Sequence, residues 1–278
     1  MSVAFDRRSV LAFALAAFAP LPALAAEPEV VEFPVNDRTV SLSVWRPASI
    51  KGVVLFSHDA GRSPDVYDAL FGAWRDAGYL VVAPLHTDSP KNTRVTDHSL
   101  QTAFLSRIED MGVAGAWASI TAVEKPVAVA GHGYGSLSAM VRAGALEERV
   151  HARDTNAKAL IAFSTPGGLA DLVADGAVAT LNLPMLLLTG DADLVPGVVT
   201  DWRDHLATFQ GGPAAGRTAW IGKGVDHGLA ARPLTDPMMA RAAALSVSFL
   251  DANLLADAAA KSRLDATTST ADAEIRRR

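Results

Sequence analysis

The stretch that most constrains the fold is residues 126–140, PVAVAGHGYGSLSAM. Residues 127–130 are an apolar run between a proline and a glycine. The run is too short for a helix and predicts a strand buried on both faces. The sequence GHGYG that follows predicts a tight turn, and the run rich in Ala, Leu and Met over residues 136–146 predicts a helix. The chain therefore contains a buried strand that passes through a sharp turn directly into a helix.

Strands and helices alternate along most of the chain. The patterns predict strands over 29–35 and 39–45, which form an N-terminal hairpin, and over 52–56, 79–83, 127–130, 157–163, 184–189 and 218–221. They predict helices over 65–77, which Gly78 closes, and over 99–120, 136–146, 198–209 and 238–255. We therefore expect an α/β fold, with a mostly parallel sheet of eight strands and helices on both faces. The polar segment 86–96 is expected to be an exposed loop, and His151 and His205 are expected at the surface.

Size and composition limit the classes of protein to which the chain can belong. The 278 residues are half hydrophobic, which suffices for one large domain. This domain is expected over residues 26–265, followed by a polar, disordered tail over 266–278. The net charge of −5 argues against nucleic acid as a partner, because nucleic acid requires a basic stripe. The chain has no cysteine, which excludes disulfides, thiolate nucleophiles and metal sites with cysteine ligands.

Residues 1–25 have the pattern of an export signal. Arg7 and Arg8 precede an apolar run over 10–19 that is too short to span a bilayer, and Ala-Leu-Ala at 23–25 is a typical cleavage site. The two arginines favour a twin-arginine signal over an ordinary secretory signal. The mature protein is then expected to be periplasmic or secreted. No later run reaches the ~18 apolar residues of a membrane helix, so no membrane contact is expected after removal of the signal.

Characteristic polar segments follow four of the predicted strands. Ser-His-Asp-Ala-Gly occupies 57–61, the glycine-rich turn occupies 131–135, Gly-Asp-Ala-Asp occupies 190–193 and Gly-Val-Asp-His occupies 224–227. Each segment comes at the carboxyl end of a strand. In this order, the four segments resemble the α/β-hydrolase family, and within it the small, lidless bacterial hydrolases of the dienelactone hydrolase type. The resemblance covers roughly residues 29–260.

The resemblance implies a catalytic site for an ester-like small molecule, without a cofactor. The family carries G-x-S-x-G at the turn, where this chain has G-H-G-Y-G. Position by position, Asp193 would be the acid that orients the histidine, and His227 would be the general base. The Tyr134 N–H would be one oxyanion donor, and an N–H from Asp59 or Ala60 would be the other.

Two positions depart from the family pattern. Gly133 stands where the family has its serine, and it has no side-chain oxygen for acyl transfer. Ser136, three residues further on, is expected to point away from the turn. Asp59 stands where the family normally has glycine, and its carboxylate would oppose the negative charge that develops in the oxyanion hole. The favoured alternative is that Asp59 turns to solvent or pairs with Arg62.

Two functions follow as hypotheses. One is slow hydrolysis, in which His227, held by Asp193, activates a water in the space that a serine side chain would fill. The other is a non-catalytic protein that binds a small apolar ligand in the former active-site pocket, an interpretation that Gly133 and Asp59 favour. Asp191 is a weaker alternative to Asp193, because an aspartate after a strand often caps the next helix.

Three further interpretations fit less well. A dinucleotide site requires G-x-G-x-x-G, whereas the spacing here is G-x-G-x-G. The polar loop also holds a set of potential metal ligands, His86, Asp88, Asp97 and His98. A solvated loop is the favoured interpretation of that segment, so no metal is predicted. Ser57, His58 and Asp59 have the composition of a catalytic triad, but adjacent residues at a strand end point in opposite directions.

Overall fold

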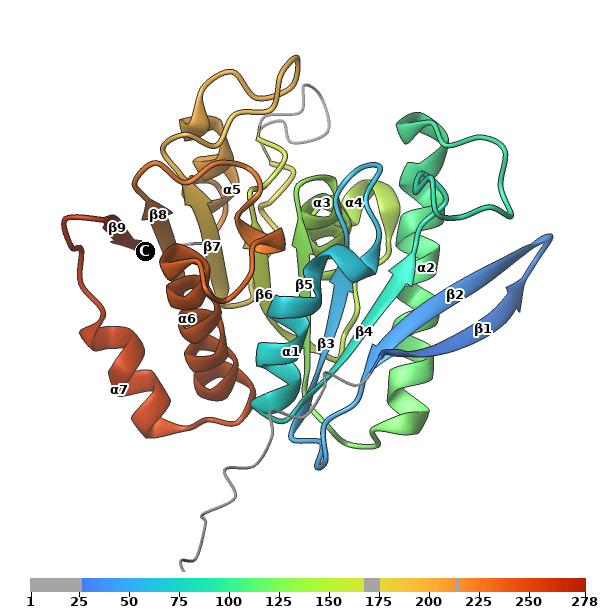
Figure 1. Ribbon diagram of the computed structural model, residues 1–278, viewed down its shortest axis with the longest axis horizontal. Coiled ribbons are helices and arrows are strands. Elements are labelled where there is room, and N and C mark those ends of the chain that lie inside the picture. Colours follow the sequence, from blue (N-terminus) through green and yellow to red (C-terminus); the bar gives the residue numbers. More distant parts are fainter. Residues whose placement is uncertain (1–26, 168–175, 214–215) are drawn as a thin grey trace, which may run out of the picture.

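The protein folds around one sheet of nine strands in the part of the chain that the structure describes, residues 27–167, 176–213 and 216–278 of a computed structural model (Figure 1). The strands lie in the order β1-β2-β4-β3-β5-β6-β7-β8-β9. The six from β4 to β8 in this order are parallel, whereas β1, β2 and β9 run antiparallel to their neighbours. In chain order the strands span Glu29–Val35, Arg38–Trp45, Gly52–Ser57, Tyr79–Leu85, Val127–His132, Ala157–Phe163, Met185–Gly190, Arg217–Gly222 and Ala273–Arg277.

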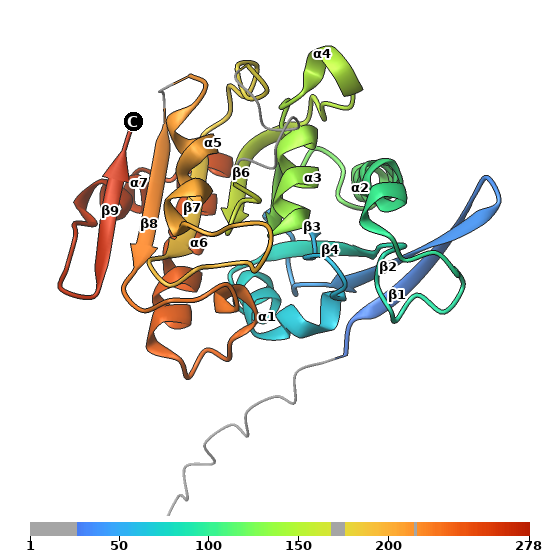
Figure 2. The ribbon, with the colours of Figure 1, turned by 90° about the horizontal axis from the view of Figure 1, so that it is seen from above.

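Helices cover both faces of the sheet. Helices α1 and α6 pack on one face, and α2 and α3 pack on the other (Figure 2). The helices are α1 (Asp68–Asp76), α2 (Leu100–Thr121), α3 (Tyr134–Arg142), α4 (Glu147–Val150), α5 (Ala207–Gln210), α6 (Pro237–Leu254) and α7 (Ala258–Ala266). Short 3-10 helices span Pro64–Tyr67, Trp202–Leu206 and Leu229–Ala231. The predicted α/β architecture, a mostly parallel sheet between two helical layers, is confirmed.

Local sequence explains where the two longest helices begin and how closely one of them approaches the sheet. The Asp236 carboxylate caps the first turn of α6, and the Ser99 hydroxyl accepts a hydrogen bond from the first turn of α2. Helix α2 continues through Gly115, where an added Cβ would lie 3.5 Å from Leu55 Cδ1 of β3, an ordinary contact distance. The tighter neighbour is the Asp154 carboxylate, whose Oδ2 would lie 3.2 Å from that Cβ.

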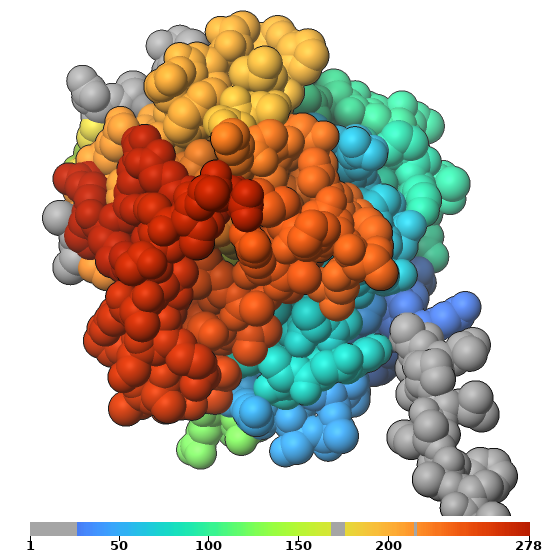
Figure 3. All heavy atoms as spheres, turned by 60° about the vertical axis from the view of Figure 1, so that its left-hand side comes forward, coloured from blue at the N-terminus to red at the C-terminus, as the bar shows by residue number. Residues whose placement is uncertain are grey.

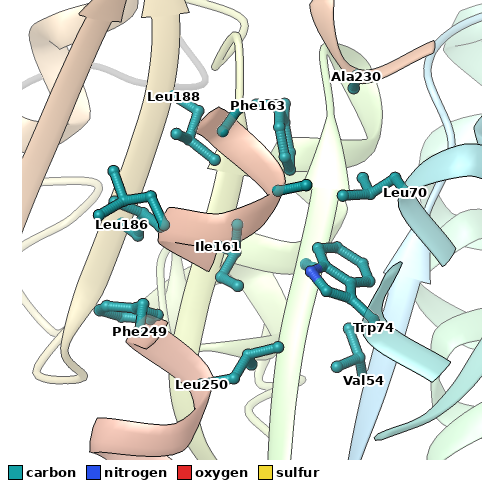
Figure 4. Close-up of a cluster of buried hydrophobic side chains, with 14 of the residues drawn as sticks. Val54, Leu70, Trp74, Ile161, Phe163, Leu186, Leu188, Ala230, Phe249 and Leu250 are labelled. Carbon is teal, nitrogen blue, oxygen red and sulfur yellow. The ribbon is translucent and has the colours of Figure 1, made fainter. Parts of the chain in front are cut away.

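Apolar side chains fill the space on each side of the sheet. Beneath α1 and α6, the fully buried Trp74 lies among Val54, Ile161 and Leu250 (Figure 4). Its indole N–H donates to Ser246 Oγ at 2.8 Å, so the one polar atom of this ring is paired. Burial of each such side chain stabilises the fold by ~1.5–3 kcal/mol. The two cores make the sheet a firm platform for the loops at its carboxyl edge.

The C-terminal residues belong to the sheet, so the prediction of a disordered tail over 266–278 is wrong. Residues Ala273–Arg277 form β9, which pairs antiparallel with β8 and gives the sheet nine strands rather than eight. Figure 3 shows this C-terminal segment, in red, packed against the orange part of the chain. Ala273 and Ile275 belong to the same apolar cluster as Trp220 and α6, while charged residues alternate with them. Only these two apolar residues carry the period of two, which is too short a pattern to mark an edge strand in the sequence.

Two loops near the carboxyl edge also differ from the prediction. The helix expected over 198–209 is confined to Trp202–Leu206 and α5, because the chain first doubles back in a bridge between Val195 and Val199. His205 is buried rather than at the surface. The segment 86–96 is exposed only in part, since four of its polar residues are buried, His86, Asp88, Ser89 and Asn92. The two ionisable ones have partners elsewhere in the fold: the His86 ring contacts Ser57 and Asp110, and the Asp88 carboxylate pairs with Arg107.

Residues 1–26 lie outside the described residues, and so does the predicted export signal. Among the described helices, none combines the length and the apolar character needed to cross a membrane. The described chain starts with the β1–β2 hairpin, which forms the edge of the sheet opposite β9.

Candidate functional site

The candidate site lies at the carboxyl edge of the parallel strands. Strands β3 and β5 are neighbours with Ser57 beside Gly131, so Asp59 emerges next to the turn that follows β5. Asp193 and His227 follow β7 and β8, which are also neighbours. The structure brings Asp59, Asp193 and His227 into direct hydrogen-bond contact. The fold thus gathers the segments at the strand ends that the sequence analysis singled out.

The turn after β5 is a sharp elbow in which close backbone contacts require glycine at 131 and 135 and a positive φ favours it at 133. Gly133 has φ +53° and ψ −119° and directly precedes α3. A Cβ on Gly135 would lie 2.5 Å from the carbonyl carbon of Ser57, and one on Gly131 would lie 2.7 Å from the nitrogen of Ser136. A residue with a side chain at position 133 would carry strain of ~1–3 kcal/mol, which glycine largely avoids.

The Asp59 carboxylate fills the space in front of Gly133. A Cβ added to Gly133 would lie 2.5 Å from Asp59 Cγ, so a side chain at position 133 and this carboxylate exclude each other. Asp59 Oδ1 accepts a hydrogen bond from the Tyr134 N–H at 2.9 Å. The expectation that Asp59 turns to solvent or pairs with Arg62 is wrong, since only 13% of its side chain is exposed. The register between β3 and β5 directs it inward.

His227 lies between two carboxylates. Its Nδ1 is 2.9 Å from Asp193 Oδ1, and its Nε2 is 3.0 Å from Asp59 Oδ2. Ionised carboxylates only accept hydrogen bonds, so both ring nitrogens carry hydrogen and the ring is an imidazolium. Burial would lower the pKa of His227, but the hydrogen bonds and charges of both carboxylates outweigh burial and raise this pKa to about 9. At neutral pH the ring therefore keeps its proton.

Asp193 is fully buried and saturated with hydrogen-bond donors. Its Oδ2 accepts from the hydroxyls of Ser164 and Thr189, and its Oδ1 lies 3.0 Å from His205 Nε2 in addition to its bond with His227. Burial would raise the pKa of Asp193, but the hydrogen bonds from His205 and His227 outweigh burial and hold the pKa well below its ordinary value. Asp193 therefore stays charged, whereas Asp191 only accepts from a loop N–H.

His205 is the residue of this site that sequence reasoning missed. Its Nδ1 donates to the Thr165 carbonyl, and its Nε2 contacts Asp193. Burial lowers the pKa of His205, but the bond to Asp193 and its charge outweigh burial and raise it. Both ring nitrogens of His205 face oxygen acceptors, so each carries hydrogen, as in His227. His205, Asp193, His227 and Asp59 form a row of alternating charge, which we call the charge row. Only the fold of the loop after β7 brings His205 into it.

His132 and Tyr67 hold the backbone side of Asp59. The Asp59 N–H donates to the Tyr67 hydroxyl at 3.0 Å, and this hydroxyl lies 3.0 Å from His132 Nδ1. His132 Nε2 lies 2.8 Å from the His227 carbonyl and must donate to it. Burial lowers the pKa of His132 to about 4, so this ring is neutral. The second oxyanion donor is predicted to be an N–H of Asp59 or Ala60, and the Asp59 N–H is engaged, so Ala60 is the residue that is left. Ala60 lines the cavity described below.

A buried ion pair fixes the same loop from below. Arg107 pairs with Asp88 at 2.7 Å and donates to the carbonyls of His58 and Asp59 at 2.7 and 3.1 Å. His58 Nδ1 lies 2.8 Å from the Asp59 carbonyl as a second donor. Asp59 is therefore held at its N–H, its carbonyl and both carboxylate oxygens.

A second arrangement of Ser, His and Asp lies inside the protein. Ser57 Oγ is 2.8 Å from His86 Nε2, and His86 Nδ1 is 2.8 Å from Asp110 Oδ2. This is the order of contacts in a catalytic triad. All three side chains are fully buried, so no substrate reaches them. We call these residues the buried triad. Burial keeps the pKa of His86 well below its ordinary value and raises that of Asp110 to about 6.

Within the described residues, two sets of three side chains are close enough to hold a metal ion. One is Asp59, His132 and His227, and the other is Asp193, His205 and His227. A histidine ligand must present a lone pair to the metal. Both nitrogens of His205 and of His227 instead face oxygen acceptors, so they donate hydrogen. The donor atoms therefore do not fit a cation. The potential metal ligands of the polar loop are also engaged, because each forms a hydrogen bond with another protein group. These residues are His86, Asp88, Asp97 and His98.

A cavity of about 640 Å³ opens above the charge row. Asp59, Gly133 and His227 line its floor. Its walls are mainly apolar and come from α2, the end of β6 and the loop after β7, with Leu100, Phe104, Pro166, Val195, Val198 and Val199. This size and lining suit a small organic molecule.

The serines next to the turn point away from the cavity. Ser136 Oγ donates to the carbonyls of Gly131 and Phe163, each at 2.9 Å. Ser138 is buried in α3, and its hydroxyl has no hydrogen-bond partner within the described part of the protein. Neither hydroxyl contacts His227, so neither replaces the side chain that Gly133 lacks.

Solved structures with the same fold include lipases and esterases. A soluble variant of monoglyceride lipase from Saccharomyces cerevisiae is 11% identical, with a TM-score of 0.62 over 84% of this chain and 98% of that one. A thermostable carboxyl esterase from Bacillus coagulans is 13% identical, with a TM-score of 0.62 over 81% and 98%. An alpha-beta serine hydrolase homologue from Coxiella burnetii is 15% identical, with a TM-score of 0.56 over 79% and 95%.

The comparisons establish the fold and nothing finer. No protein-family model matches the chain, and no curated protein matches it either. At identities below a fifth, the likeness to solved structures shows that the chain has the α/β-hydrolase fold, as the sequence predicted. Function has to be argued from the site itself.

Proposed function

We propose that this protein binds a small, uncharged and largely apolar molecule in the cavity above the charge row and lacks serine-type esterase activity. The observation that carries the proposal is the Asp59 carboxylate, which stands in front of Gly133 and accepts the Tyr134 N–H. An N–H that already binds a carboxylate cannot polarise the carbonyl of an ester. In this proposal Gly133 is the former nucleophile position. The closer likeness to the dienelactone hydrolase type stays a prediction.

The lining of the cavity supports an apolar ligand. Most of the wall is aliphatic or aromatic, and Arg62 adds one exposed charge to the lining. At the floor the charges are paired with one another, so a charged ligand would have to compete there with these internal pairs, whereas an apolar ligand gains by leaving water. The mouth exposes Leu100 and Val198, with 42% and 52% of each residue accessible to solvent.

Binding can be tested with Nile red, a neutral apolar dye whose fluorescence rises when it leaves water. The protein should bind the dye, and 1-hexanol should displace it. Val198→Trp, at the cavity mouth, should weaken binding about tenfold, which corresponds to ~1.4 kcal/mol. Leu234→Trp is the matched control, because Leu234 is similarly exposed but does not line the cavity. Equal binding by both variants, or hydrolysis of p-nitrophenyl butyrate by the unaltered protein, would contradict the proposal.

Slow hydrolysis by a water that His227 activates is the second candidate. The 2.9 Å bond between Asp193 and His227 favours it, because the same bond orients a catalytic histidine. A base must be unprotonated, and with a pKa of about 9 only about 1% of His227 is neutral at pH 7. Hydrolysis should therefore rise roughly tenfold per pH unit up to pH 9 and vanish in His227→Ala. A rate that does not depend on pH between 6 and 9 would eliminate this candidate.

Export of the protein is also a proposal. Arg7 and Arg8 are the residues that a twin-arginine translocon would recognise. Changing both to lysine should leave the uncleaved chain in the cytoplasmic fraction. Unchanged export of that variant would favour an ordinary secretory signal.

A further inference from the structure

We propose that Asp59 is a nucleophile, and that this site displaces a halide from a saturated carbon of an apolar substrate and hydrolyses the resulting ester. The inference rests on the proposed binding of an apolar molecule in the cavity. The observation behind it is the juxtaposition of Asp59, the Tyr134 N–H and the ring of His227 at the floor of that cavity. A nucleophile, an oxyanion donor and a base are thus present, while among the described residues the ring nitrogens of His227 bond to carboxylates and not to a hydroxyl.

The Asp59 carboxylate is held in place and reaches the cavity. Its N–H bonds to Tyr67, and its carbonyl accepts from Arg107 and His58. These bonds fix the backbone of Asp59, and the Tyr134 N–H and His227 Nε2 hold its two carboxylate oxygens, which favours reaction with a molecule bound above it. The 13% of its side chain that is exposed faces the space where ligands enter.

The geometry favours attack on a saturated carbon over attack on an ester. Acyl transfer needs donors for the carbonyl oxygen of the substrate, and Asp59 Oδ1 occupies the Tyr134 N–H. Displacement at a saturated carbon develops no such oxyanion on the substrate. A halide also leaves without a proton, so the first step needs no acid.

In the first step, a lone pair of Asp59 Oδ2 forms a bond to the carbon that bears the halogen. The carbon–halogen bond breaks, and its electron pair leaves with the halide. Asp59 becomes a neutral alkyl ester, with Oδ1 as its carbonyl oxygen still at the Tyr134 N–H. His227 then has one charged neighbour, Asp193, instead of two. One cause of its raised pKa is gone, and the ring can release its proton to solvent.

In the second step, the neutral His227 takes a proton from a water whose oxygen attacks Asp59 Cγ. The negative charge that forms on Oδ1 lies at the Tyr134 N–H, which now acts as an oxyanion donor. Collapse breaks the bond between Cγ and the alkyl oxygen, and the alcohol leaves with the proton from His227. The new Asp59 carboxyl returns its own proton to the ring. The sum is alkyl halide plus water giving alcohol, halide and one proton.

The test uses 1-bromohexane and the full protein. Wild type should release bromide over many turnovers, and Asp59→Asn should fall to the uncatalysed rate. His227→Gln should stop after the first step, with one hexyl group attached to Asp59 in the intact mass and in the peptide map. Asp76→Asn is the matched control and should behave as wild type, because Asp76 is an exposed residue of α1.

Oxygen labelling keeps the proposal falsifiable even if these variants fail to fold. In water enriched in ¹⁸O, a single turnover of wild type should place the label in Asp59 and not in the 1-hexanol. Label in the alcohol, or no bromide release by wild type, would overturn the proposal. Nile red binding without bromide release would leave the binding proposal standing, and loss of both would overturn the two together.

Discussion

The protein contains two rows in which a histidine bonds to an aspartate on one side and to an oxygen on the other. In the buried triad, His86 lies between Ser57 and Asp110 and is sealed from solvent. In the charge row, His227 lies between Asp59 and Asp193 at the floor of a cavity. The first row has the residue types of a catalytic triad, but no substrate can reach it. The second row is open to substrate from the cavity, but it contains no serine.

The difference between the rows teaches that access and charge, rather than residue type, decide what such an arrangement can do. Ser57 is a neutral partner, so one ring nitrogen of His86 can act as an acceptor. Burial and the charge of Arg107 keep the pKa of His86 low. Asp59 is an anion, and with Asp193 it keeps His227 protonated despite burial. The neutral base is therefore out of reach of substrate, and the accessible ring is not a free base at pH 7.

The largest effect is expected when the charge row is converted into an accessible triad. Gly133→Ser alone should give no esterase, because the new side chain collides with Asp59, and Asp59→Gly alone supplies no nucleophile. The double variant should hydrolyse p-nitrophenyl butyrate about 100-fold or more faster than either single variant. Asp59→Gly with Gly133→Ala is the control that opens the same space without a hydroxyl. Full activity of Gly133→Ser alone would show that the Asp59 carboxylate does not block a side chain at position 133.

The next largest effect concerns the stability of the buried triad. His86→Ala removes a fully buried ring and leaves Ser57 and Asp110 without one partner each, so unfolding free energy should fall by about 3 kcal/mol. His98→Ala is the matched control, since His98 is exposed and should cost under about 1 kcal/mol. Urea unfolding followed by circular dichroism measures both. Equal losses in the two variants would show that the buried row adds nothing to stability.

The two histidines should change stability with pH in opposite directions. The folded pKa of His227 is about 9, above the ordinary value of 6.5. Its contribution is therefore complete below pH 6.5 and is lost as pH rises through 9. The folded pKa of His86 is lowered, so stability instead falls as pH drops below 6.5. His227→Gln should flatten only the alkaline slope, by roughly 2 kcal/mol between pH 6.5 and 9. A flattened acid slope in this variant would refute the assignment.

The smallest effects are expected at two serines of α3 that belong to neither row. Ser136→Ala should cost about 1 kcal/mol, because Ser136 Oγ donates to two backbone carbonyls. Ser138→Ala should be neutral or slightly stabilising, because it removes a buried hydroxyl that has no partner. Thermal melts of the two variants would separate them. A larger loss in Ser138→Ala would mean that this hydroxyl is paired.

The α/β-hydrolase fold and the neighbourhood of the site could be predicted because they depend on local patterns. Apolar runs, glycines and a polar residue after each strand suffice to predict Asp193 and His227 at one edge of the sheet. The inward direction of Asp59 depends on register, Ser57 beside Gly131, and no local pattern encodes it. His205 and His86 have polar neighbours in the sequence that suggest solvent, and only tertiary hydrogen bonds explain their burial. In β9, the alternation of apolar and charged residues rests on Ala273 and Ile275 alone, which is too short to predict a strand.

The most direct test of the central claim is a nitrogen NMR titration of the His227 ring in the full protein. The account predicts that both ring nitrogens carry hydrogen at pH 7 and that the ring titrates near pH 9, with a lower midpoint in Asp59→Asn. A His227 ring that is neutral at pH 7 and titrates near its ordinary pKa of 6.5, unchanged in that variant, would contradict it.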